Sequence, residues 1–212
     1  RRGPRGRPVA DGTVTLVAGG PVTALVDTGG PWGGQRLLGL LARRGVAPGQ
    51  VTHVVCTHGH ADHVGNLNLF PVATWVVGTE VTRGEGEVVA SGLEKGRPYV
   101  LHPAHLEVVA TPGHTGSHVS LVARATSLGT AVVAGDLFER EGDEGEWRAW
   151  SEDPERQEKS RKRVLAMADV IVPGHGPPFR VLRDRGGPGD EEEEEGDSDN
   201  DAGGGRGEGG AC

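Results

Sequence analysis

Long apolar runs and cysteines are scarce in this sequence, and each shortage excludes a class of protein. None of the apolar runs in the 212 residues approaches the roughly 20 residues that a membrane-spanning helix needs. We therefore expect a soluble protein with no membrane partner. The two cysteines are Cys56, at the end of a predicted strand, and Cys212, the last residue. Such unequal positions argue against a disulfide and favour a reducing compartment, the cytosol or the nucleus.

The sequence also lacks the basic excess that is typical of nucleic-acid-binding proteins. The formal net charge is -8, and ten of the 30 acidic residues lie from Asp190 onward with one of the 22 basic residues. The preceding 189 residues therefore hold 21 basic and 20 acidic residues. Composition alone does not predict an interaction with nucleic acid. A small local patch would escape this count, and candidates for it are Arg36, Arg43, Arg44 and Arg180.

Composition divides the chain into three segments. Residues 1–12 hold four arginines among glycine and proline, which predicts a flexible basic arm. Residues 13–185 alternate short apolar runs with turn residues, which predicts one α/β domain. Residues 186–212 include five consecutive glutamates and many glycines, and such a segment cannot bury enough apolar surface to offset its ordering entropy. We expect this acidic tail to be disordered.

The most informative segment reads Thr-His-Gly-His-Ala-Asp-His and begins at Thr57. Imidazole and carboxylate are the ligands that a borderline divalent cation such as zinc takes. In a tight turn, His58 and His60 can converge on one ion, while Asp62 and His63 point to a second. The spacing therefore predicts a metal site.

Three further donors stand in the same local setting as this motif. In each case a short apolar run predicts a buried strand, glycine or proline turns the backbone, and one ligand-type residue follows. The pairs of strand and donor are Val51–Cys56 with the histidine motif, Leu106–Ala110 with His114, Thr130–Ala134 with Asp136, and Val170–Val172 with His175. Because α/β folds place their chemistry at the carboxyl ends of strands, these donors predict one shared site.

Seven donors suit two metal ions better than one. The predicted ligands are His58, His60 and His114 for the first ion, Asp62, His63 and His175 for the second, and Asp136 as a bridge between them. Zinc is the expected metal, with iron and manganese as alternatives. Any one of these residues alone would be read as an ordinary polar loop residue, but seven in this order form a specific signal.

This ordered set resembles the metallo-β-lactamase superfamily, whose members carry the same histidine motif, a later histidine, a bridging aspartate and a last histidine. Four longer segments carry the resemblance as well: Leu25–Trp32, Val64–Pro71, Ala134–Arg140 and Val172–Arg180. It implies a four-layer αβ/βα sandwich, in which two mixed sheets pack face to face with helices outside and metals at one edge. Because the first residue is Arg1 and not Met, the fold could lack its first strand or two.

Within the family, the resemblance points to an endoribonuclease that acts on the 3′ end of histone pre-mRNA, with single-stranded RNA as its partner and a homodimer as a possible assembly. Two metal ions can generate a hydroxide near neutral pH and stabilise the leaving oxygen of a phosphodiester. Asp62 would orient this hydroxide and take its proton, and His175 would serve as a ligand or as the acid to the leaving group. Asp27, after the predicted strand Thr23–Val26, would support the histidine turn from behind the ligands, although its own chemistry equally suits a plain turn.

Three other functions remain open at this stage. A thioester hydrolase like glyoxalase II shares the ligands but usually carries a C-terminal helical domain, whereas this chain continues into an acidic tail. An iron-dependent sulfur dioxygenase would need only two histidines and one aspartate on one iron. A scaffold without activity is disfavoured, because no ligand position is lost.

The remaining patterns predict packing more than chemistry. Helices are expected from Leu37 to Arg44 and from Pro154 to Ala168, the second with a cap residue just before the proline. Trp147 and Trp150 precede the second helix and are expected to pack in the core or to line a pocket or dimer contact. The other histidines are not expected to serve as ligands, namely His53, His102, His105 and His118.

Overall fold

The computed structural model describes residues 10–182. The predicted acidic tail and the first nine residues of the predicted basic arm lie outside the described residues. In the part that is described, no helix combines the length and the apolar character that crossing a bilayer would require.

The first half of the described chain forms a mixed sheet of six strands in sequence order. Its strands are β1 (Thr15–Gly19), β2 (Val22–Val26), β3 (His53–Cys56), β4 (Thr74–Val77), β5 (Glu80–Arg83) and β6 (Glu87–Val89). Strands β2, β3 and β4 run parallel, while the outer pairs β1–β2, β4–β5 and β5–β6 are antiparallel. The parallel centre places the carboxyl ends of β2 and β3 side by side.

The second half forms another mixed sheet of six strands in the order β12-β11-β10-β9-β8-β7. Its strands are β7 (Tyr99–His102), β8 (Leu106–Ala110), β9 (Val119–Thr126), β10 (Gly129–Gly135), β11 (Val170–Pro173) and β12 (Phe179–Arg180). Strands β10 and β11 are parallel. Because β8 and β10 are both antiparallel to β9, the strands β8, β10 and β11 end at the same edge of the sheet.

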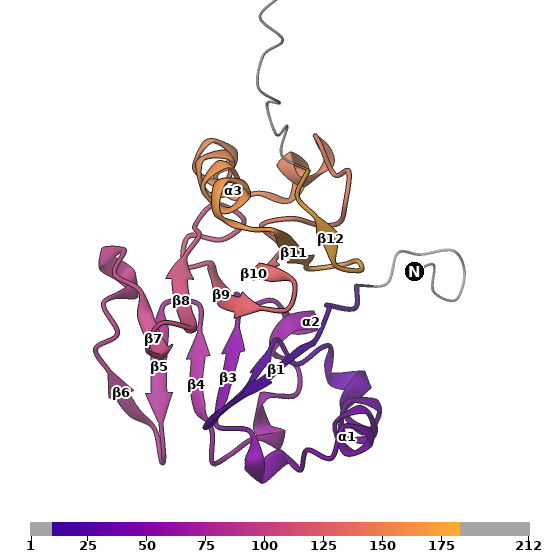
Figure 1. The fold of residues 1–212 in the computed structure, drawn as a ribbon, viewed down its shortest axis with the longest axis vertical. Helices are drawn as coiled ribbons and strands as arrows, with labels where there is room; N and C mark the ends of the chain where they lie inside the picture. Colours follow the sequence, from indigo (N-terminus) through magenta and orange to yellow (C-terminus); the bar gives the residue numbers. More distant parts are fainter. Residues whose placement is uncertain (1–9, 183–212) are drawn as a thin grey trace, which may run out of the picture. The chain divides into compact units, whose positions relative to one another are not determined.

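Helices cover the outer face of each sheet (Figure 1). The helix α1 (Gly34–Arg43) buries Leu37 and Leu41, four residues apart on one face, against the outer face of the first sheet. The helix α3 (Pro154–Met167) packs Val164 against the outer face of the second sheet. With the two sheets between them, these helices form the four-layer αβ/βα sandwich that the sequence resemblance implies, and this prediction is confirmed.

Side-chain alternation along the strands explains the three apolar clusters. In β3, Val54 joins the cluster beneath α1, whereas its neighbour Val55 joins the cluster between the sheets. In β10, Val132 faces α3 and Val133 faces the other sheet. The central cluster draws residues from both sheets, so the sheets pack face to face through a shared core.

Several predicted elements appear close to their expected positions. The strand Leu106–Ala110 matches the prediction, and the helix from Pro154 ends at Met167, one residue early. The cap before this helix is Asp153, whose carboxylate accepts a hydrogen bond from the Arg156 backbone N–H at 3.0 Å. The histidine motif differs from the prediction in one respect. Its last residues lie in the single-turn helix α2 (Ala61–Val64) and not in a plain turn.

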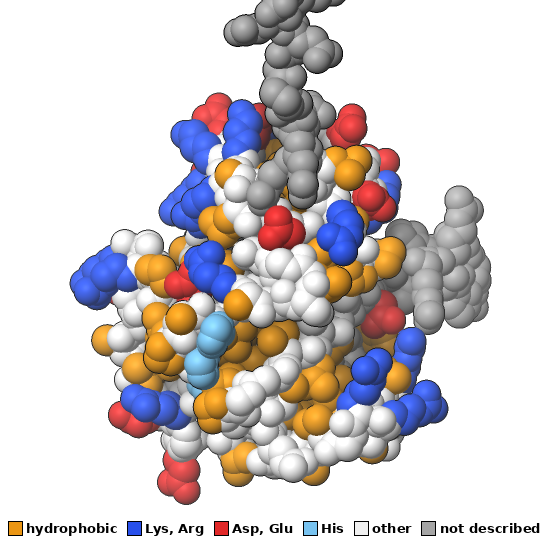
Figure 2. All heavy atoms as spheres, in the orientation of Figure 1, with side chains coloured by type: hydrophobic (Ala, Val, Ile, Leu, Met, Phe, Trp, Pro, Cys, Tyr) orange, Lys and Arg blue, Asp and Glu red, His pale blue; other side chains and the backbone are white. Residues whose placement is uncertain are grey.

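Charged side chains of both signs are interspersed over the face of the molecule drawn in Figure 2. Basic side chains gather over α1 and over α3 and do not join into one continuous basic surface on this face. This mixture of charges agrees with the nearly equal numbers of basic and acidic residues among residues 1–189.

Candidate metal centre

The two sheets bring the ends of five strands to one edge of the sandwich. Asp27 follows β2, the histidine motif follows β3, and His114, Asp136 and His175 lie beyond the ends of β8, β10 and β11. A backbone hydrogen bond of 2.9 Å from Val119 N–H to the Thr57 carbonyl joins the two sheets at this edge. The topology therefore delivers residues from distant parts of the sequence to one pocket.

One group of donors could hold a first ion. It consists of His58, His60, His114 and Asp136, whose ligand atoms all lie within 4.8 Å of one another. The Nδ1 atom of His60 lies 2.9 Å from Nε2 of His58 and 3.3 Å from Nε2 of His114. His58 and His114 are buried, whereas His60 is exposed at the mouth of the pocket. These three histidines are the set that the sequence assigns to the first ion.

A second group lies beside the first. Asp62, His63 and His175 also offer ligand atoms within 4.8 Å of one another. The Oδ2 atom of Asp62 is 3.6 Å from Nε2 of His63 and 3.8 Å from Nε2 of His175. The turn of helix α2 carries Asp62 and His63, and the His175 side chain is 26% exposed.

Asp136 reaches both groups, as a bridging ligand must. Its Oδ2 atom lies 3.7 Å from Nε2 of His58 and 3.4 Å from Nε2 of His114. The same carboxylate lies 3.2 Å from Nε2 of His175 through Oδ2 and 3.2 Å from Nε2 of His63 through Oδ1. The structure thus gathers all seven predicted ligands around one buried carboxylate.

The donor chemistry fits a pair of divalent cations. Five imidazoles and two carboxylates face a common centre, which is a ligand set for zinc or a similar ion. Two of the atoms aimed inward, His63 Nε2 and Asp136 Oδ1, are buried and lie 3.2 Å apart without the geometry of a hydrogen bond to each other or to another described residue. Because poorly oriented polar contacts are costly when they are buried, a bound cation that both atoms ligate would give each of them a better partner.

Without a cation, protons occupy this site. Burial lowers the pKa of His63, but the charge of Asp27 and the interactions with Asp136 outweigh burial and raise the pKa to about 11. For His175, burial again lowers the pKa, and the hydrogen bond to Asp136 with the charges of Asp136 and Glu139 raises it above the usual value. Burial with the neighbouring His63 lowers the pKa of His58 far below the usual value, so that this ring stays neutral and free to bind a metal.

Asp27 supports the histidine motif from behind at both of its ends. Its Oδ1 atom accepts a hydrogen bond of 2.7 Å from the Thr57 backbone N–H, and its Oδ2 atom accepts one of 3.1 Å from the Thr57 hydroxyl. Oδ2 also lies 2.8 Å from Nδ1 of His63, which fixes that ring with Nε2 toward the site. Asp27 has a positive φ of 57°, a conformation that aspartate tolerates better than most residues and that is common at functional sites.

Two further residues lie near the site, of which the sequence predicts no role for Glu139 and no ligand role for His118. Glu139 forms a third potential ligand group with Asp136 and His175, and burial with the charge of Asp136 raises the pKa of Glu139 to about 7. The only sequence signal for it is its position three residues after Asp136. His118 is fully buried, stacks on His58 with ring centroids 5.3 Å apart, and shares a 3.0 Å hydrogen bond with the Thr111 hydroxyl.

The pocket around the metal centre has a volume of about 650 Å³. Besides predicted ligands, it is lined by Ala10, Asp11, Arg36, Glu139, Arg140 and Trp150. Of the four arginines considered from the sequence, Arg36 lies at this pocket, whereas Arg140 was not anticipated. The assignment of the seven donors as ligands, with the proton-transfer roles of Asp62 and His175, stays a prediction.

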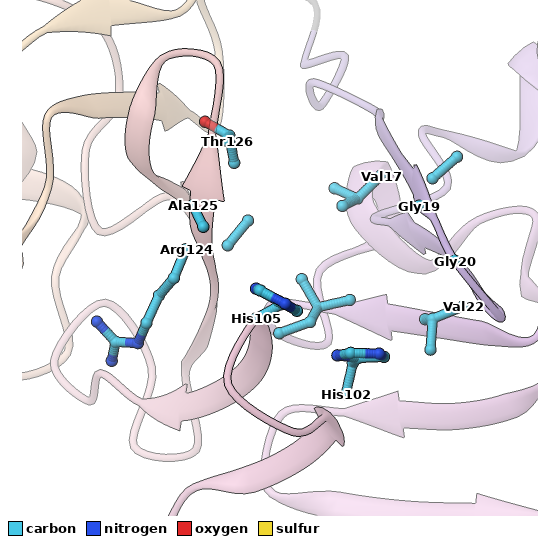
Figure 3. Close-up of a pocket in the computed structure, with 12 residues that line it drawn as sticks. Val17, Gly19, Gly20, Val22, His102, His105, Arg124, Ala125 and Thr126 are labelled. Atoms are coloured by element: carbon cyan, nitrogen blue, oxygen red, sulfur yellow. The ribbon is translucent and has the colours of Figure 1, made fainter.

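A second cavity of about 510 Å³ lies at the opposite end of the strands (Figure 3). It lies between the turn of β1 and β2 at Gly19 and Gly20 and the end of β9, and the rings of His102 and His105 face into it. These two rings stack with centroids 5.1 Å apart. No carboxylate lines this cavity within residues 10–182, so it lacks the mixed ligand set of the metal centre.

Comparisons with known proteins agree with this geometry. The family model described as the metallo-beta-lactamase superfamily matches residues 7–175. The chain is 62% identical over 175 residues to metallo-beta-lactamase domain-containing protein 1 of Xenopus laevis, a match that covers 82% of this chain and 74% of that protein. It is 57% identical over 192 residues to the protein of the same name from Homo sapiens, covering 90% of this chain and 71% of that protein.

Solved structures show the same fold at lower sequence identity. An N-acyl homoserine lactone hydrolase, described with the product N-hexanoyl-L-homoserine bound at the catalytic metal center, aligns with a TM-score of 0.58 and 22% identity. The alignment covers 76% of this chain and 79% of that chain. This likeness supports the αβ/βα architecture and says nothing of the substrate.

Proposed function

The chain belongs to the metallo-beta-lactamase superfamily, and from this premise we propose that it is a dinuclear metal-dependent hydrolase that cleaves RNA as an endoribonuclease. The observation that carries the proposal is the position of Asp136, whose carboxylate reaches both donor groups. Histone pre-mRNA is the proposed substrate because the family resemblance that the extended motifs carry implies it.

The donor groups favour hydrolysis over the one-metal alternative. A mononuclear iron dioxygenase needs two histidines and one carboxylate, whereas this pocket gathers seven donors in two adjacent groups. Two divalent cations held by these residues would lower the pKa of a bound water and stabilise the charge that develops on a phosphodiester. Zinc remains the proposed metal, with iron and manganese as alternatives.

The protein's own residues supply positioning and proton transfer in this proposal. Asp62 lies on α2 and is only partly buried, so its carboxylate can orient an attacking water and accept its proton. His175 either completes the second ligand group or protonates the leaving oxygen through the same Nε2 atom. The two roles exclude each other, because an Nε2 atom bound to a cation carries no proton to donate.

Substrate turnover by matched variants tests the proposal. The purified 212-residue chain, loaded with zinc, is incubated separately with single-stranded RNA and with S-lactoylglutathione. We expect RNA cleavage that is inhibited by a chelator. His60→Ala should lower the cleavage rate more than about 100-fold, because removal of even the outer partners of metal ligands costs 10- to 100-fold.

His105→Ala is the matched control, since this histidine is exposed and faces the second cavity. Its RNA cleavage should equal that of the unchanged protein. Hydrolysis of the thioester with no RNA cleavage would replace the proposal with a glyoxalase II-like activity. Elemental analysis should give two zinc ions per chain, and one iron would favour the dioxygenase.

A further inference from the structure

An exposed tryptophan stands at the mouth of the metal pocket. Trp150 lines this pocket, and its side chain is 69% exposed. It ends the short 3-10 helix η6 (Glu146–Trp150), whose other tryptophan, Trp147, is only 2% exposed. The buried ring packs against the guanidinium groups of Arg148 and Arg161, at 4.5 and 4.8 Å from the ring centroid. Trp147 thus anchors the helix, while Trp150 presents a flat apolar surface to the pocket.

The backbone next to Trp150 is fixed to the loop that carries a predicted ligand. The Ser151 hydroxyl donates a hydrogen bond of 3.1 Å to the Gly113 carbonyl, and the Glu152 backbone N–H donates one of 3.2 Å to the His114 carbonyl. The Glu152 carboxylate accepts a hydrogen bond of 2.8 Å from the Gly116 backbone N–H. Trp150 is therefore held at a set position relative to His114, which limits the entropy that a ligand stacking on it would have to offset.

Two arginines face the same pocket. Arg36 lies on the exposed side of α1 and makes no ion pair with any other residue of the range 10–182. Arg140 pairs with Glu146, but both side chains are more than half exposed, so this ion pair is weak and open to exchange. Four carboxylates also line the pocket, and their combined charge at most equals that of two divalent cations, so the two arginines leave a positive excess; the carboxylates are Asp11, Asp62, Asp136 and Glu139. With metals bound, the pocket therefore attracts anions.

We propose that Trp150 stacks on a nucleobase next to the cleaved bond, while Arg36 and Arg140 bind the flanking phosphates. This inference rests on the proposed function and specifies how that site recognises single-stranded RNA. An RNA strand alternates flat bases with phosphates, which matches an aromatic ring set beside guanidinium groups. Stacking requires no particular base, so this subsite favours single-stranded over paired RNA and does not read the sequence.

The test compares the kinetics of Trp150→Ala and Trp150→Phe with those of the unchanged holoenzyme on a short single-stranded RNA. We expect Trp150→Ala to raise KM about tenfold, within the range that loss of one stacked base causes, and to change kcat less than about twofold. Trp150→Phe should restore most of the affinity, because a smaller aromatic ring still stacks. An RNA with an abasic nucleotide beside the cleaved bond should bind both the unchanged protein and Trp150→Ala equally weakly.

Trp32→Ala is the matched control, because Trp32 is 63% exposed and does not line the metal pocket. For the arginines, the double variant Arg36→Gln with Arg140→Gln should reduce the salt dependence of KM, whereas Arg44→Gln at the end of α1 should not. Circular dichroism and metal content must match the unchanged protein in every variant.

The outcomes separate the two proposals. If RNA is cleaved but Trp150→Ala behaves like Trp32→Ala, the stacking subsite is wrong and the endoribonuclease assignment stands. If the unchanged protein does not cleave RNA, the endoribonuclease assignment fails. Fluorescence anisotropy with a 2′-O-methyl oligonucleotide then measures whether the stacking subsite binds RNA. Binding that Trp150→Ala weakens would support the subsite, and binding that it leaves unchanged would overturn it.

Discussion

By our proposal, protons and cations compete for the same atoms at the candidate metal centre. The pKa of about 11 for His63 means that the metal-free site carries a proton at neutral pH. A cation must displace this proton, because a protonated imidazole nitrogen has no lone pair to donate. The same carboxylate, Asp136, therefore holds either a protonated imidazole or, by our proposal, a metal pair.

Metal uptake should release protons and weaken as the pH falls. The pKa of His63 is about 11, so below pH 11 the metal-free site holds a proton on His63 that the metal-bound site has lost. The apparent affinity for zinc should decrease about tenfold per pH unit for each displaced proton. Calorimetric titration at pH 7 in two buffers of different ionisation enthalpy measures the number of protons that are released per chain when zinc binds. Release of at least one proton per chain is expected, and no release would contradict the competition.

Asp27 should control metal affinity without touching the metal. Asp27→Asn removes one acceptor oxygen from the group that holds Thr57 and the His63 ring. We expect zinc affinity to fall 10- to about 100-fold in a chelator competition, since partners behind metal ligands have effects of this size. Asp153→Asn is the control, because asparagine still caps α3 and lies outside the site. Equal affinities of the two variants would refute this role of Asp27.

At the scale of elements, the turns after strands decide whether ligands meet. Gly174 follows β11 and precedes His175, and a Cβ atom at this position would overlap Oδ1 of Asp136. The turn therefore requires the smallest residue, because any side chain would displace the Asp136 carboxylate. Gly59 lies between two predicted ligands, and a Cβ atom added there would meet no other group within 4 Å.

Exchange of these two glycines for alanine should have opposite outcomes. Gly174→Ala should lower the zinc content of the purified protein and its thermal midpoint, because Asp136 or the β11 turn must shift. Gly59→Ala should leave both quantities close to those of the unchanged protein. Elemental analysis with a thermal melt provides the comparison, and an unchanged metal content in a folded Gly174→Ala protein would contradict the geometry.

The sequence predicts the elements that lead to the ligands better than the others. Strands such as β8, β10 and β11 are apolar runs closed by glycine or proline, so their local pattern is unambiguous. Strands β5 and β6 contain charged residues and lie at one side of the first sheet, where burial is partial and the pattern is weak. Their pairing depends on the neighbouring strands, which the local sequence does not encode.

The sequence also does not predict which individual side chains are buried. Trp147 and Trp150 lie three residues apart in one polar segment, yet one is buried and the other is exposed at the pocket. The sequence leaves open whether His118 lies behind the ligands or at the surface, and it is fully buried behind His58. These differences arise from packing between segments distant in the chain, whereas the seven donors were predictable because each follows a strand end.

At the scale of the whole molecule, metal binding should stabilise the fold. The donors come from both sheets, so they meet only in the folded state, and a cation that binds only this state raises the free energy of unfolding. At a free concentration about 1,000 times Kd, the gain is about 4 kcal/mol, or about 10 °C for a chain of this length. Thermal melts with zinc and with excess chelator test this, and identical midpoints would contradict it.

By our proposal, seven side chains from both sheets hold two cations in one pocket. Anomalous diffraction from crystals of the zinc-loaded protein tests it most directly. We predict two peaks, one among His58, His60 and His114, the other among Asp62, His63 and His175, with Asp136 in contact with both. A single peak, or zinc bound only beside His102 and His105, would contradict the account.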